Sequence, residues 1–274
     1  MRKILIAFDG NHFSEGAFEF ARKLSKIESI LLTGIFLPEV DYANLWSYSG
    51  GMNSPIMMPP VSEDVKINSR KTVELFTEAC QKAEIEFRIH KRLFDFTLPE
   101  LKKESSFADL LIVGSEKFYE NLGTDGLNDF LRDTLHEVFC PVVVVPEKYQ
   151  FPYNNILTYD GTPSSVYAIK QFAYLFPDLA DNDSILVYAS PDERLDLPER
   201  KNIEDLVNCH YPELKIMNLN IDPNKQFAQW LHEKKGSILI SGAFGRSDLS
   251  RLFKKSFVQD VIKEHRLPVF IAHR

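Results

Sequence analysis

The chain has 274 residues, of which 44% are hydrophobic and 26% charged, and this is the composition of a globular protein long enough for two domains. Its formal net charge of −7 excludes a nucleic acid or an anionic membrane as the main partner, because both attract basic surfaces. Three cysteines without paired spacing favour a reducing, cytoplasmic compartment, and no stretch approaches the ~18 apolar residues of a membrane span.

The first half of the chain predicts strands that alternate with helices. The opening apolar run ends at Asp9, so it is expected to be a strand and is too short for a signal peptide. An amphipathic helix follows, because Ala17, Ala21 and Leu24 recur at helical spacing. The later elements that we expect are a strand over 29–37, a helix over 61–83, a strand over 86–92, a helix over 98–106, the strand "DLLIVG", a helix before Pro141 and the final strand "PVVVVP".

Two segments of the first half stand outside this alternation. Residues 42–63 are rich in Gly, Pro, Met and aromatic side chains and have no counterpart later, so we expect a long loop there that either is mobile or lies over the empty cleft of the first domain. Residues 147–154, "EKYQFPYN", combine charge, proline and polar groups, which is typical of a linker. The chain is therefore expected to divide into domains at 1–147 and 154–274.

The second half repeats the pattern of the first. Residues 2–24 and 154–176 each contain an apolar strand that ends in Asp-Gly, a turn with Ser and an amphipathic helix. Counted back from Pro141 and Pro268, the apolar positions of the last helix also match between the halves. The other elements that we expect are a strand over 184–190, a helix over 198–209, a strand over 214–220, a helix over 224–234, the strand "SILISG" and the final strand "LPVFIAH".

Strands that alternate with helices pair in parallel through right-handed crossovers. The continuously apolar strands "DLLIVG" and "SILISG" fit a sheet that helices cover on both faces. The predicted fold is therefore α/β, with two doubly wound five-stranded parallel sheets related by a pseudo-twofold. We expect the final strands of the two halves to pair, because "PVVVVP" would invite aggregation as a bare edge. A further homodimer is then not required.

A loop near the C-terminus has the composition of an anion-binding site. The strand "SILIS" is followed by Gly242 and Gly245, then by basic residues, and then by Ser256, which with Gln259 can form a capping box. The free N–H groups and the positive dipole end of a helix hold phosphate at such a start. The plain alternative is that the glycines only make a tight strand-to-helix turn.

The two halves differ in charge at this loop. Residues 243–256 carry a formal charge of +3, from four basic side chains against Asp248, whereas the matching residues 115–129 carry −3. In the first half Asp129 stands at the expected helix cap, where its carboxylate would take the N–H donors and repel a polyphosphate. We therefore expect the first site to be closed to ATP and the second to accept it.

These features together resemble the universal stress protein family, in its tandem form and over nearly the whole chain. The family has an adenine nucleotide alpha hydrolase-like fold whose first strand ends in an Asp that meets a nucleotide; Asp9 and Asp160 match this Asp. Nucleotide-binding members carry Gly-x-x-Gly, nine residues, and then Gly-Ser or Gly-Thr. Gly242, Gly245 and Ser256 match this motif, whereas Lys255 replaces the third glycine.

The first half departs further from the family motif. Gly114 is present, but Lys117 replaces the second glycine and Asn128-Asp129 replaces Gly-Ser. The resemblance implies a non-enzymatic stress-response protein that binds ATP or another adenine nucleotide, with Mg²⁺ accompanying it, in the C-terminal half. Asp160 would contact the ribose or base, and the loop residues the phosphates.

Two alternatives stay open beside this interpretation. The degenerate loops could serve as partner surfaces of a nucleotide-free interaction or regulatory module. Slow ATP hydrolysis is the weaker alternative, because the sequence presents no nucleophile beside a base and no metal-ligand constellation. Lys255 stays ambiguous as well, since its side chain either pairs with a phosphate or fills the space that the ligand needs.

Overall fold

The computed structural model describes residues 1–9, 12–37, 63–90, 98–116, 134–135, 137–190, 192, 196–221, 223–242, 258, 261–262, 264 and 266–273. The predicted loop 42–63 lies outside these residues, apart from the start of a helix at Glu63. Gly245, Lys255 and Ser256 of the predicted nucleotide loop also lie outside them, whereas Asp160 and Gly242 lie inside.

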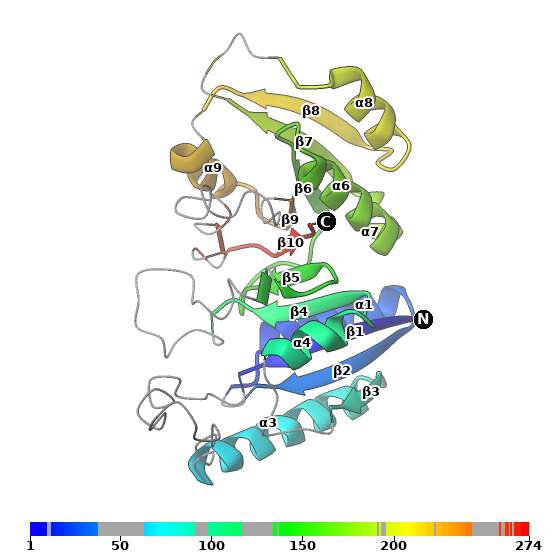
Figure 1. Ribbon diagram of the computed structural model, residues 1–274, viewed down its shortest axis with the longest axis vertical. Helices are drawn as coiled ribbons and strands as arrows, with labels where there is room; N and C mark the ends of the chain where they lie inside the picture. The colour runs from blue at the N-terminus through cyan, green and yellow to red at the C-terminus, as the bar shows by residue number, and fades with distance from the viewer. Residues whose placement is uncertain are drawn as a thin grey trace, which may run out of the picture.

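The described strands form one ten-stranded sheet in the order β3-β2-β1-β4-β5-β10-β9-β6-β7-β8, which runs from β3 near the bottom of Figure 1 to β8 near the top. The strands are β1 (Arg2–Phe8), β2 (Ile30–Phe36), β3 (Glu86–Ile89), β4 (Leu110–Gly114), β5 (Val142–Val145), β6 (Asn154–Thr158), β7 (Asp183–Ala189), β8 (Leu214–Leu219), β9 (Ser237–Ser241) and β10 (Val269–Ile271). Within each half all pairings are parallel. The predicted α/β class is confirmed.

The helices fall where the apolar periodicity predicts them. They are α1 (Glu15–Ile27), α3 (Glu63–Lys82), α4 (Leu98–Ser105), α6 (Pro163–Leu175), α7 (Pro177–Ala180), α8 (Arg200–Asn208) and α9 (Pro223–Leu231). The short helix α7 was not predicted. It begins at Pro177, directly after α6. A proline after a helix usually marks the end of that helix, but a proline is also favourable in the first turn of a new one.

Helices bury a separate core on each face of the sheet. One core joins α1, α3, α6 and α8 to strand residues such as Ile4, Ile112 and Ile240. The other contains Leu101 of α4 and Phe227 of α9, packed on the opposite face. Strands covered on both faces need apolar side chains at every position, and β4, β5, β9 and β10 are buried throughout.

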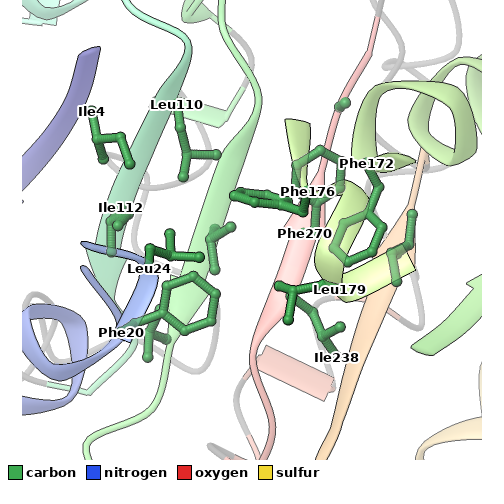
Figure 2. Packing of buried hydrophobic residues seen from close by; sticks show 14 of the residues in the cluster. Ile4, Phe20, Leu24, Leu110, Ile112, Phe172, Phe176, Leu179, Ile238 and Phe270 are labelled. Atoms are coloured by element: carbon green, nitrogen blue, oxygen red, sulfur yellow. The ribbon is translucent and has the colours of Figure 1, made fainter. Parts of the chain in front are cut away.

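The two halves meet at the antiparallel pair of β5 and β10. Val143 pairs with Phe270 at the centre of this contact, and Val142–Val145 are at most 1% exposed. Phe270 in turn contacts Phe172, with the ring centroids 5.3 Å apart. Figure 2 shows Phe20 on the first-half side of this junction and Phe176 and Phe270 on the second-half side. The expected pairing of the final strands is confirmed, and it covers what would be two exposed sheet edges.

We predict that Val143→Asp lowers the free energy of unfolding far more than the same kind of substitution at the surface. A carboxylate placed at the β5–β10 contact has no buried partner, so the free energy of unfolding should fall by about 4 kcal/mol. Leu75→Asp on the exposed side of α3 is the control, with an expected loss below about 1 kcal/mol. Urea denaturation of both variants measures this, and equal midpoints would contradict the role given to the junction.

Candidate functional site

In each half the sheet has a topological switch point, from which successive crossovers lead in opposite directions. β1 lies between β2 and β4, and β6 lies between β7 and β9, so the switch points lie at the β1–β4 and β6–β9 pairs. Ligands of open α/β sheets bind outside the carboxyl ends of the strands at such points. Asp160 follows β6 and Gly242 follows β9, which brings both predicted residues to the second switch point.

The Asp160 carboxylate organises the first turn of α6. Its Oδ1 accepts a hydrogen bond from the Thr162 backbone N–H, at 2.9 Å, and another from the Thr162 hydroxyl, at 2.7 Å. Thr162 is the N-cap of α6, and its side-chain oxygen accepts from the Ser165 N–H. The side chain of Asp160 is exposed, and the hydrogen bonds described for it all end on Oδ1. Its Oδ2 therefore has the capacity to accept from a ligand hydroxyl.

Gly242 is required by packing between β9 and α6. A Cβ atom at this position would lie 2.1 Å from the Ser164 carbonyl oxygen and 2.6 Å from the Ser165 nitrogen, and both are backbone atoms that cannot turn away. Gly114 is similar in the first half, because its Cβ would lie 2.5 Å from Oγ of Ser14, the N-cap of α1. The first glycine of each loop thus has a packing role even without a ligand.

The residues just before α8 pack against the turn that follows β6. The Tyr159 hydroxyl donates to the Pro198 carbonyl at 2.9 Å, and a Cβ on Gly161 would lie 2.8 Å from Cβ of Pro198. Gly161 has φ of +81°, a conformation that favours glycine. Leu197 is buried beside this contact. Residues 197 and 198 therefore hold the turn after Asp160 from the β7 side.

In the first half a histidine engages the matching aspartate. Asp9 accepts the His12 backbone N–H on Oδ1 at 2.7 Å, and its Oδ2 lies 2.8 Å from Nδ1 of His12. Both carboxylate oxygens therefore have partners within the chain. Sequence reasoning missed His12; its place three residues after the strand-end Asp is the signal that could have indicated it.

An internal carboxylate also fills the start of α1. Glu147 follows β5, and its Oε1 accepts the Ser14 hydroxyl at 2.5 Å while its Oε2 accepts the Gly16 N–H at 3.2 Å. The Glu147 N–H in turn donates to Glu116 Oε2 at 2.8 Å. These donors belong to a helix N-terminus, which attracts anions. A phosphate approaching this helix would meet two carboxylates already in place.

The second half has no acid at either matching position of the sequence. Counted from Pro141 and Pro268, Glu147 corresponds to Arg274, and counted from Gly114 and Gly242, Glu116 corresponds to Phe244. Sequence analysis placed Glu147 in the linker and so missed its role. The bonds of Glu147 to α1 support the expectation that the first half is closed to a polyphosphate.

Other titratable clusters offer little chemistry in the described part of the chain. No group of three or more His, Cys, Asp or Glu side chains there could hold a metal ion. Burial raises the pKa of Cys80 and of Cys140 to about 12, so both remain neutral thiols at physiological pH. None of the helices searched is both long and apolar enough to cross a bilayer, within the residues described.

We predict that Glu147→Gln destabilises the protein although it preserves the shape of the side chain. The change removes a negative charge from the α1 N-terminus and places an amide N–H₂ against a hydroxyl or an N–H donor. We expect a loss of about 1–2 kcal/mol in the free energy of unfolding. Glu86→Gln, on exposed strand β3, is the control and should change stability by less than about 0.5 kcal/mol. Chemical denaturation of both variants decides, and equal stability would argue against an energetic role for this cap.

Neither models of protein families nor curated proteins match this chain, whereas solved structures do. A universal stress protein from Archaeoglobus fulgidus is similar with a TM-score of 0.71 and 13% identity, over 100% of this chain and 96% of that chain. A functionally unknown protein from Pseudomonas aeruginosa PAO1 is similar with a TM-score of 0.59 and 12% identity, over 100% of this chain and 92% of that chain. The chain therefore shares the α/β fold of the universal stress protein structure from Archaeoglobus fulgidus over its whole length.

Proposed function

We propose that this protein is a non-enzymatic, cytoplasmic stress-response protein whose C-terminal half binds an adenine nucleotide, ATP or a relative of it. The observation that carries this proposal is the meeting of Asp160 and Gly242 at the first turn of α6. Asp160 fixes the turn through Thr162, and Gly242 lies against Ser164. The two residues thus flank the switch-point crevice between β6 and β9, where open α/β sheets bind their ligands.

Different residues of this half would contact different parts of the nucleotide. The exposed Asp160 carboxylate offers an acceptor to the ribose hydroxyls or the base. The loop that begins at Gly242, with Gly245, Lys255 and Ser256, supplies backbone donors and positive charge for the phosphates. The nucleotide phosphates would carry any Mg²⁺, because the described residues contain no cluster of ligands for it.

A nucleotide-free interaction or regulatory module is the second candidate. The packing of Gly242 against the Ser164 backbone favours it, since this contact explains the glycine without any ligand. The lysine at position 255, where the motif has glycine, points the same way. In this case the basic loop of residues 243–256 would be a surface for an acidic partner.

Calorimetry with ATP separates the two candidates. If the proposal holds, wild-type protein binds ATP, and Asp160→Asn weakens the binding because it removes the charge but keeps an oxygen for the Thr162 N–H. Ser256→Asp and Gly245→Asp put a carboxylate near the phosphates. A charge-assisted contact is worth roughly 1.5–3 kcal/mol, so each change should lower the affinity at least about tenfold.

The matched control lies in the first half. Asp9→Asn makes the same chemical change at the pseudo-equivalent position and should leave ATP affinity unaltered, because that crevice is expected to be closed. No heat at millimolar ATP, together with no nucleotide released on denaturing freshly purified protein, would refute nucleotide binding. The interaction module would then take its place. Phosphate release above that of a boiled control would instead contradict the non-enzymatic part of the proposal.

A further inference from the structure

A hollow of about 510 Å³ lies beside the first turn of α1, and we call it the α1 pocket. The described residues that line it belong to two segments, residues 13–19 at the start of α1 and residues 147–149 after β5. This volume is within the range of small-ligand sites in proteins, which is about 300–1,000 Å³. The pocket lies on α1 in the first half, so it is separate from the crevice proposed for a nucleotide.

The two segments that line the pocket are fixed to each other. A Cβ on Gly16 would lie 2.1 Å from the Pro146 carbonyl oxygen, so only glycine lets α1 approach the chain after β5 this closely. Glu147 accepts the Gly16 N–H, and the Tyr149 hydroxyl donates to the Gly16 carbonyl at 3.4 Å. The pocket is therefore formed before any ligand arrives, which lowers the entropy cost of binding.

Aromatic rings make up the apolar part of the lining. Phe13 and Phe18 contact each other with their centroids 5.6 Å apart, and Tyr149 lies on the opposite segment. Phe13 also stacks on the fully buried Phe8, at 5.2 Å, which anchors this wall in the core. The faces of aromatic rings carry negative electrostatic potential, and they attract cations with organic bodies.

Carboxylates outnumber cations around these rings. Glu15, Glu19 and Glu147 line the pocket, against a single lysine, Lys148. Glu19 binds the Arg22 guanidinium with two hydrogen bonds of 2.6 Å, which hold the pKa of the Glu19 carboxyl below its usual value. Glu19 is thus already neutralised by a guanidinium.

Two carboxylates remain available to a ligand. Among the described residues no cation pairs with Glu15, which is exposed at the first position of α1. Each oxygen of Glu147 accepts one described hydrogen bond, whereas a carboxylate has about four acceptor positions. Against Lys148 the two carboxylates leave a formal side-chain charge of −1 beside three aromatic rings, and the partial positive charge of the α1 N-terminus offsets part of it.

We propose that the α1 pocket binds an organic cation with a guanidinium or ammonium head, held by Glu15 and Glu147 and covered by Phe13, Phe18 and Tyr149. This chemistry excludes a nucleotide as the occupant, because its phosphates would face Glu15 and Glu147. A free small molecule and the arginine side chain of a peptide both present such a head group. The proposal does not depend on nucleotide binding in the second half.

A pair of probes with the same shape tests the charge. Butylguanidinium and the neutral butylurea are titrated separately into the full-length protein, with binding followed by NMR shifts. We expect saturable binding of butylguanidinium that weakens as salt is added, and at least about threefold weaker binding of butylurea. Acetyl-arginine amide in a third titration identifies the source, because tighter binding of this probe points to an arginine of a peptide.

Variants of opposite expected sign complete the test. Glu15→Gln should weaken butylguanidinium binding by about threefold, and Lys148→Gln should tighten it by a similar factor. No hydrogen bond or ion pair is described for Glu15 or Lys148, so neither change should disturb the fold. Glu147 is not substituted in this test, because it caps α1. Glu86→Gln on β3 is the control and should bind as wild type does. Equal binding of butylurea, no saturable binding of the cation, or a Lys148→Gln variant that binds no tighter would each overturn the proposal.

Discussion

The antiparallel pairing of β5 with β10 is the contact on which the rest of the molecule depends. Each half by itself would expose a strand of consecutive apolar residues, and "VVVV" at an open sheet edge is a template for aggregation. Pairing the two final strands covers both edges at once. On each face of the sheet it also joins the apolar residues of the first half to those of the second half in one core. Because this pairing is antiparallel, it places the halves in a pseudo-twofold relation.

The same junction creates the differences between the halves. The chain leaves β5 directly toward α1, which carries Glu147 to the Ser14 hydroxyl and the Gly16 N–H. In the second half the residue at the matching place after β10 is Arg274. The first half thus has an internal carboxylate at the start of α1, whereas the sequence of the second half has no acid at the matching position. A duplicated unit can keep its packing while its loop sequences take opposite formal charge, since packing depends on the apolar residues and the charge on the loops.

The glycines illustrate how packing and function overlap. Gly242 and Gly114 both lie where the backbone or cap of a helix leaves no room for a Cβ. A motif built on such positions persists for structural reasons even after its ligand is lost. For the proposed nucleotide site, we therefore expect Asp160, Lys255 and the predicted cap Ser256, rather than the glycines, to decide whether a ligand binds.

Local sequence determined the order of the elements, because apolar spacing reports which face of each helix or strand is buried. It also placed Asp160 and Gly242 at the ends of their strands, since parallel strands bring their carboxyl ends to one edge. The tertiary structure alone decided that Glu147 caps a helix 131 residues earlier, and that Pro198 lies over Gly161. It also decided the α1 pocket, which forms where Tyr149 meets the first turn of α1. These contacts join segments far apart in the chain, and no periodicity within one segment encodes the partner that it will meet.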